Sequence, residues 1–283
     1  MIIRIALQLN RETTLARKSK QMIDDMAQVV QIIPIPAFKD NYIWLIHNNH
    51  YAIVVDPGDA AVVNNTLTKL NLTLQTILIT HHHQDHIGGV DLLLETHPGA
   101  KIFAPKNESY VFAHQPVGEP DTIDLGNWMN TARVIDVPGH TLGHVAYYIK
   151  QNQQEWLFCG DTLFGAGCGR LFEGTPTQMM QSLEKLTALP ENTLVFCTHE
   201  YTLHNINFAL TLEPNNQALI NRHQQTTDLI NLGKPTLPST IKLELATNPF
   251  LRSDSVEIQS SLQLNKPTQL ETFSKTRLLR NSY

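Results

Sequence analysis

The sequence predicts an α/β domain of layered sheets and helices over residues 29–200, followed by a helical domain over residues 201–283. Short β-rich apolar runs alternate with helical patterns up to Glu200, and only helical patterns, joined by proline-containing turns, follow that residue. A hydrophobic content of 42% supplies a buried core, and a charged content of 17% is too low for a disordered chain. We therefore expect two domains in these 283 residues.

The individual elements follow from periodicity and turn residues. Runs rich in β-branched and aromatic residues predict strands at 31–35, 42–47, 51–56, 74–80, 101–104, 132–137, 145–150, 155–159 and 194–198. Helical patterns at 61–70, 88–96 and 176–189 lie between them, and Thr175 followed by Pro176 predicts the start of the last helix. Helices at 201–213, 214–232 and 268–281 are expected in the second domain.

Composition and charge limit the kinds of partner that the protein can bind. A formal net charge of −5 disfavours a nucleic-acid surface, and no apolar run reaches the length of a membrane span. The three cysteines, Cys159, Cys168 and Cys197, are odd in number and widely spread, which indicates free thiols in a reducing compartment. We expect a cytoplasmic monomer that acts on a small molecule, with no nucleic-acid or membrane partner.

Residues 1–28 differ from the rest of the chain, because they carry five basic residues and Glu12 is the only acid before Asp24. A secretory signal is a poor explanation, since Arg4 interrupts the short apolar run and no clear cleavage site follows. We expect these residues to form a poorly ordered extension. The alternative is that the true translation start is Met22 or Met26 and that the sequence begins upstream of it.

Residue types that bind metals follow four of the predicted strands. The strand at 74–80 runs directly into the segment 81–86 (HHHQDH), and the later strands are followed by His140, Asp161 and His199. Because strand ends of an α/β sheet lie along one edge, these residues are expected to converge. One buried histidine alone is as often structural as functional, but the whole set indicates a metal site.

Geometry divides the candidate ligands into two sets. In an extended segment alternate side chains point to the same side, so the first and third histidines of the segment 81–86 face one ion. The chain then turns into a helix, which aims the last two residues of the segment at a second ion. The first set is His81, His83 and His140, the second is Asp85, His86 and His199, and Asp161 bridges the two.

This ligand chemistry indicates a catalytic rather than a structural centre, because it lacks thiolates and leaves room for a shared water. Imidazole and carboxylate suit Zn²⁺, while iron and manganese fit as well. Six other histidines are expected to be exposed, capping or hydrogen-bonded residues, although His144 could support a ligand from behind and Asp56 could orient a ligand histidine. The six are His82, His97, His114, His144, His204 and His223.

At these residues the sequence resembles the metallo-β-lactamase-fold hydrolases, whose signature Thr-His-x-His-x-Asp-His reads here from Thr80 to His86. The segments "IPAFKDNYIW", "VDPGD", "VPGHTLGH", "CGDTLFGAGCGR" and "THEYT" resemble the glyoxalase II branch, hydroxyacylglutathione hydrolase. The resemblance implies a four-layer αββα domain followed by a helical domain that helps bind glutathione. It also implies the same two ligand sets and hydrolysis of a glutathione thioester, foremost S-D-lactoylglutathione. In that reaction we expect Asp85 or Asp161 to carry the proton.

The resemblance further implies substrate contacts at Arg170, Phe172, Tyr201, Arg277 and Arg280. Arg170 and Arg280 stand where the family pattern has lysine, and Phe172 stands where many members have tyrosine. Arginine keeps the charge and adds a bidentate fork for carboxylates. Loss of the phenolic hydroxyl removes at most one hydrogen bond, worth about 1 kcal/mol.

Proteins with other functions share this fold, so three alternatives are a mononuclear iron persulfide dioxygenase, a β-lactamase and a lactonase. The complete set of candidate ligands favours two metals over one, and a β-lactamase has no need of the helical domain. A noncatalytic metal-binding or scaffold protein is a further alternative, which the complete ligand set disfavours.

Overall fold

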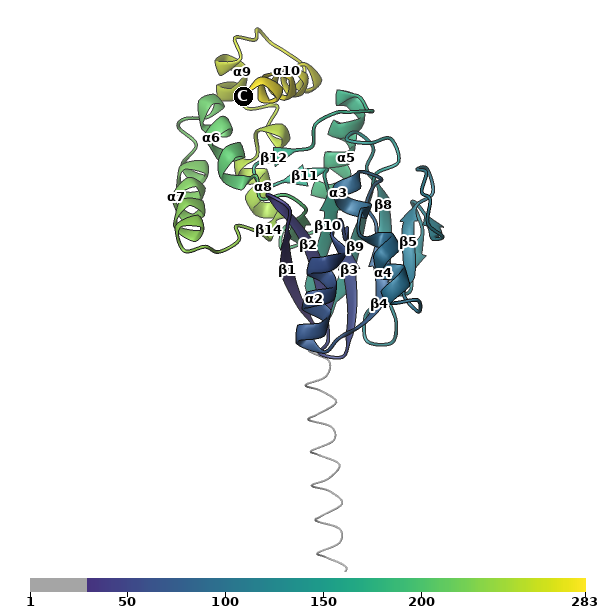
Figure 1. The fold of residues 1–283 in the computed structure, drawn as a ribbon. Helices are drawn as coiled ribbons and strands as arrows, with labels where there is room; N and C mark the ends of the chain where they lie inside the picture. The colour runs from purple at the N-terminus through teal and green to yellow at the C-terminus, as the bar shows by residue number, and fades with distance from the viewer. Residues whose placement is uncertain (1–29) are drawn as a thin grey trace, which may run out of the picture.

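The computed structural model describes residues 30–283, so the expected extension at 1–28 lies outside the described residues. Two six-stranded sheets form a sandwich, and all of their strands except β14 (Ser239–Thr240) come from the first part of the chain (Figure 1). The first sheet has the order β1 (Gln31–Ala37), β2 (Asn41–His47), β3 (Tyr51–Val55), β4 (Thr73–Leu78), β5 (Lys101–Pro105) and β6 (Gln115–Val117). The second has the order β14 (Ser239–Thr240), β13 (Leu194–Cys197), β10 (Gln154–Gly160), β9 (Val145–Gln151), β8 (Ala132–Asp136) and β7 (Thr122–Ile123).

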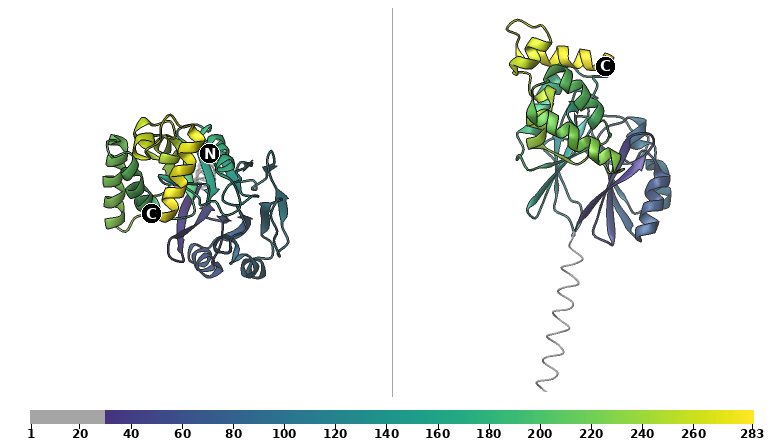
Figure 2. Two further views of the ribbon diagram at one scale, coloured as in Figure 1. Left: turned by 90° about the horizontal axis from the view of Figure 1, so that it is seen from above. Right: turned by 90° about the vertical axis from the view of Figure 1, so that its left-hand side faces the viewer.

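The sheets pack face to face, with helices outside them (Figure 2). Inward side chains of the first sheet, such as Trp44 and Ile53, form one buried cluster with those of the second sheet, such as Tyr147 and Phe158. The outer face of the first sheet is covered by α2 (Ala60–Leu70) and α4 (Val90–Thr96), whose apolar side chains are buried against it. The helix α5 (Pro176–Thr187) packs on the second sheet. The predicted four-layer αββα architecture is confirmed.

The helical part comprises α6 (Thr202–Leu212), α7 (Gln217–Asn231), α8 (Ile241–Thr247), the 3₁₀ turn η1 (Pro249–Leu251), α9 (Val256–Ser261) and α10 (Gln269–Ser282). These helices lie at one end of the sandwich (Figure 1). Side-chain caps start most of them, and Thr268 with Glu271 forms a complete capping box at α10. A short hairpin of β11 (Leu163–Phe164) and β12 (Gly167–Cys168) extends from the second sheet toward these helices.

Several predicted boundaries were wrong. The strand expected at 74–80 ends at Leu78, and the helix expected at 88–96 is two helices, α3 (Gln84–Ile87) and α4. The helix expected at 214–232 begins at Gln217, because the Asn216 side chain accepts a hydrogen bond from the backbone N–H of Leu219. The prediction that strands stop at Glu200 missed β14, which pairs antiparallel with β13. Within residues 30–283, no helix has the length and apolarity that crossing a membrane requires.

Candidate metal centre and substrate pocket

Four loops that follow β4, β8, β10 and β13 bring the candidate ligands to one end of the sandwich. The backbone at the end of β10 shows how the turn is made. Gly160 has φ 47°, and a Cβ atom there would lie 2.3 Å from the Thr80 hydroxyl oxygen. Only glycine tolerates both the left-handed backbone and this close approach, so the chain can turn sharply just before Asp161.

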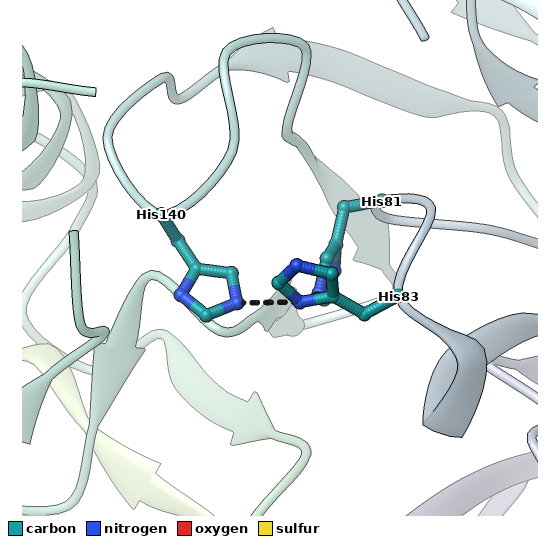
Figure 3. A group of neighbouring side chains, drawn as sticks. All are labelled: His81, His83 and His140. Atoms are coloured by element: carbon teal, nitrogen blue, oxygen red, sulfur yellow. Dashed lines mark hydrogen bonds between the residues drawn. The ribbon is translucent and has the colours of Figure 1, made fainter. Parts of the chain in front are cut away.

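The first group of side chains is His81, His83 and His140, whose ligand atoms lie within 4.8 Å of one another. Figure 3 shows the rings of His83 and His140 facing each other from two separate loops. The His83 Nδ1 atom lies 3.0 Å from His140 Nε2 and 3.1 Å from His81 Nε2. Tetrahedral zinc with nitrogen ligands at 2.0–2.1 Å would separate those nitrogens by about 3.3 Å, so the spacing suits one ion.

The second group is Asp85, His86 and His199. Asp85 Oδ2 lies 3.4 Å from His199 Nε2 and 3.6 Å from His86 Nε2. Asp161 faces both groups, since its Oδ2 atom lies 3.4 Å from both His140 and His199 and its Oδ1 atom lies 3.5 Å from His86. The structure therefore brings together all seven residues that the sequence predicted as ligands.

The protonation states differ between the two groups of candidate ligands. Burial is the largest cause that lowers the pKa of His81, His83 and His140 below the ordinary value of histidine, so these rings favour the neutral form that a metal requires. Burial opposes ionisation of Asp161, but the cationic forms of His199 and His86 outweigh it and hold its pKa well below the usual range. Burial also opposes a charge on His199, yet Asp161 and other carboxylates raise its pKa to about 11. The first group thus offers neutral imidazoles and Asp161 retains its charge, whereas His199 holds a proton that a bound metal would displace.

Two buried polar atoms inside the centre lack hydrogen-bond partners in the part of the chain that the structure describes, which fits a bound ion. His86 and Asp161 are almost wholly inaccessible, yet His86 Nε2 and Asp161 Oδ1 have no hydrogen-bond partner within the described residues. Buried polar groups are rarely left in this state, because each costs about 1–3 kcal/mol. Imidazole nitrogen and carboxylate oxygen are ligands for a divalent transition metal, so the residues fit the expected cofactor.

A surrounding shell orients the ligands. His199 Nδ1 lies 2.8 Å from Asp40 Oδ1, His140 Nδ1 lies 2.8 Å from the carbonyl oxygen of Arg170, and His86 Nδ1 lies 3.0 Å from Asp56 Oδ2. Each contact directs the opposite ring nitrogen toward the centre. The sequence reasoning proposed this role for Asp56 but missed Asp40 and its neighbour Asn41, which donates to Asp85 Oδ2 at 3.0 Å. Both lie in the "KDNY" turn, whose position beside the ligands depends on sheet pairing.

Two further histidines contact the ligands. The His144 ring stacks on His81 with a centroid distance of 4.6 Å, and its Nε2 atom accepts a hydrogen bond from the backbone N–H of Asp161. His82 points the other way, toward Glu108 at 3.2 Å and Glu173 at 3.4 Å. The alternation expected for the segment 81–83 is therefore present.

A cavity of about 370 Å³ opens beside the metal centre and contains all five predicted substrate contacts in its wall. The Phe172 ring is 60% exposed and meets the edges of His83 and His140, and Tyr201 stacks on His199 with a centroid distance of 4.7 Å. His140 and Asp161 belong to the same wall, so the cavity is continuous with the centre. The lining residues that sequence reasoning missed are Phe164, Cys168, His204 and Asn205.

The three cavity arginines differ in their surroundings. Arg277 is 6% exposed and donates from Nη1 to the carbonyl oxygen of Cys168 at 2.6 Å, so it also anchors the hairpin. Arg280 is half-buried, and Arg170 is exposed. Within residues 30–283, none of the three forms an ion pair, whereas Arg222 and Arg252 elsewhere in the helical part each pair with a glutamate. The cavity thus carries uncompensated positive charge.

Comparison with known proteins agrees with these features. Residues 38–199 match the model of the metallo-beta-lactamase superfamily, and residues 200–283 match the model of the hydroxyacylglutathione hydrolase C-terminus. Proteins named hydroxyacylglutathione hydrolase from Methylobacillus flagellatus and Aliivibrio fischeri are 51% and 45% identical to this chain. The first alignment covers 89% of this chain and 99% of the relative, and the second covers 90% and 100%.

Solved structures agree on the fold. The ETHE1 structure from Myxococcus xanthus aligns with a TM-score of 0.59 at 23% identity, covering 90% of this chain and 99% of that one. The BLEG-1 B3 metallo-beta-lactamase aligns with a TM-score of 0.57 at 24% identity, covering 79% of this chain and 100% of that one. The sequence matches to both domains go further than the shared fold, and the chain belongs to the hydroxyacylglutathione hydrolase family of the metallo-β-lactamase superfamily.

Proposed function

We propose that this protein hydrolyses S-(2-hydroxyacyl)glutathione thioesters, foremost S-D-lactoylglutathione, to glutathione and a 2-hydroxy acid. One observation carries the proposal. The His and Asp cluster opens directly into a cavity whose wall holds three arginines without acidic partners. Glutathione carries two carboxylates, so a local cluster of unpaired cations in a chain of net charge −5 is the feature that this ligand requires.

His81, His83 and His140 would hold one divalent ion, Asp85, His86 and His199 would hold the other, and Asp161 would bind both. Zn²⁺ is the first choice for this donor set, with iron and manganese as the alternatives. When bound, such ions lower the pKa of water from about 16 toward 7 and stabilise negative charge on a carbonyl oxygen.

The residues of the chain supply binding, orientation and proton transfer. Arg170, Arg277 and Arg280 bind the carboxylates of glutathione, which places the thioester beside the metal centre. Phe172 and Tyr201 contribute apolar surface between the arginines and the ligand histidines, and so limit the water around the reacting carbonyl. The thiolate of glutathione is a sufficiently good leaving group that no separate acid is needed.

Two carboxylates are candidates to accept the proton of the attacking water. The side chain of Asp85 is 40% exposed, whereas that of Asp161 is 9% exposed. A proton accepted by Asp85 therefore reaches bulk solvent more readily, while Asp161 is better placed to keep its charge between the two ligand groups. We assign proton transfer to Asp85 and the bridging position to Asp161.

The experiment combines metal analysis with steady-state hydrolysis of S-D-lactoylglutathione by the wild type and by Arg280→Met. Loss of a charge-assisted contact worth about 1.5–3 kcal/mol should raise KM at least tenfold with little change in kcat. Arg133→Met is the matched control, because Arg133 is exposed on β8 outside the cavity. Two metals per chain without thioester turnover would refute the proposed substrate and favour a lactone or β-lactam.

We also propose that the chain acts as a monomer in the cytoplasm. Its three cysteines are free and buried, which supports a reducing compartment. Size-exclusion chromatography with light scattering tests the monomeric state, and cell fractionation tests the cytoplasmic location.

A further inference from the structure

We propose that Asn205 is a positioning residue that orients the guanidinium group of Arg280 toward a carboxylate of the ligand. The residue lies on α6, where α10 and the hairpin β11–β12 meet, and it belongs to the cavity wall. The inference rests on the proposed function, since it concerns how the same cavity recognises the glutathione part of the substrate.

The contacts of Asn205 fix the direction of its side-chain amide. The residue is 4% exposed, and its Oδ1 atom accepts hydrogen bonds from Arg280 Nε at 3.1 Å and Arg280 Nη2 at 3.0 Å. Its Nδ2 atom donates to the carbonyl oxygen of Gly165 at 3.0 Å. A flipped amide would present hydrogens to a cation and oxygen to a carbonyl, so only one orientation satisfies all of these partners.

The hairpin is packed closely against this amide. A Cβ atom added at Gly167 would lie 2.4 Å from Asn205 Nδ2, closer than a side chain can approach. The amide therefore joins three segments of the cavity wall, because one end meets the hairpin and the other meets α10.

The geometry leaves one edge of the guanidinium available. Asn205 uses the edge formed by Nε and Nη2, while the edge formed by Nη1 and Nη2 has no protein acceptor among residues 30–283. A carboxylate can accept two parallel hydrogen bonds from such an edge. Burial, followed by the positive charge of Arg277, lowers the pKa of Arg280, which indicates that this cation lacks a compensating charge.

The chemistry of the amide matters as much as its position. An amide oxygen orients the guanidinium without neutralising it, whereas an aspartate would form an ion pair and compete with the ligand. A lysine at position 280 would carry a compact ammonium group, which has no planar edge for the amide oxygen of Asn205 to orient. Asn205 and Arg280 are therefore interpreted as a matched pair.

A double-mutant cycle tests the inference with the zinc-loaded enzyme. We would measure KM and kcat for S-D-lactoylglutathione, and the Kd of S-hexylglutathione by calorimetry, because this thioether has no ester bond to cleave. Asn205→Ala should raise both KM and Kd about tenfold and change kcat less than twofold. In an Arg280→Met background the same substitution should change KM and Kd less than twofold.

Two further variants separate positioning from folding. Asn205→Asp keeps the acceptor toward Arg280, and it should weaken thioether binding at least as much as Asn205→Ala because the ion pair neutralises the cation. Asn207→Ala is the matched control on the same helix, since Asn207 is exposed and contacts His223 instead of the cavity. It should leave KM and Kd unchanged.

The outcomes are distinguishable. Equal penalties for Asn205→Ala with and without Arg280, in an enzyme that hydrolyses the thioester, would overturn the positioning role and leave the proposed function intact. A wild type that binds no thioether and hydrolyses no thioester would overturn both.

Discussion

Replacing Glu244 by glutamine should lower the free energy of unfolding by about 3–5 kcal/mol, the range seen when one partner of a buried ion pair is removed. Glu244 is fully buried in α8, and its Oε1 atom accepts from Arg222 Nη2 at 2.6 Å and from the hydroxyl of Ser239. Its Oε2 atom accepts from the backbone N–H of Ala166 at 2.8 Å and from Asn248 Nδ2 at 3.0 Å. This carboxylate thus connects the helical part to the hairpin beside the substrate cavity.

The magnitude follows from these four hydrogen bonds. Glutamine has one acceptor atom and one donor group, so either orientation turns an NH₂ group toward donors. It also leaves the buried guanidinium of Arg222 without a counter-charge, and each buried group left unsatisfied costs about 1–3 kcal/mol. In an Arg222→Met background the amide can donate to the Ser239 hydroxyl, so the same change should cost only about 1 kcal/mol.

Equilibrium urea unfolding of the zinc-loaded protein, followed by far-ultraviolet circular dichroism, measures these differences. Glu191→Gln is the matched control, because Glu191 lies 3.9 Å from Lys242 in an exposed pair, and it should leave stability unchanged. If Glu244→Gln costs no more than Glu191→Gln, or costs the same with and without Arg222, the interpretation of Glu244 as a coupled buried charge is wrong.

Three other predictions follow from the structure. Dialysis against a chelator should abolish hydrolysis and lower the melting temperature, because the neutral imidazoles and Asp161 would lose the metal ions that they share. Zinc addition should restore both, and a chelated enzyme with full activity would contradict the metal sites. Asp56→Asn should weaken metal binding about 10–100-fold in a competition titration, since Asp56 orients His86; unchanged affinity would exclude that role. Burial opposes ionisation of Glu213, but Arg252 and Ser255 hold its pKa below the ordinary value. Because a depressed folded pKa adds stability above the unfolded pKa of about 4.3, Glu213→Gln should be less stable than the wild type at pH 7. That difference should shrink as the pH falls below about 4 through the folded pKa, and a constant difference from pH 7 to pH 3 would contradict it.

The ligand set was predictable because it depends on residue types at the ends of strands. The segment 81–86 begins three residues after the last residue of β4, and Asp161 directly follows β10, so strand patterns and elementary sheet geometry suffice to bring them together. The alternation that separates His82 from its neighbours is likewise a local property of an extended chain. The four-layer architecture needed more than periodicity, and it came from the resemblance of whole segments to a known family.

The remaining features depend on contacts between residues far apart in the chain. His199 meets Asp40 across 159 positions, and Asn205 meets Arg280 across 75 positions. The strand β14 has only two residues, and it is a strand because it pairs with β13. An asparagine or a glutamate has the same local preferences whether it faces solvent or a buried guanidinium. The sequence by itself therefore determined which residues could bind metal, whereas the tertiary structure decided which polar side chains orient them and which cations in the cavity remain unpaired.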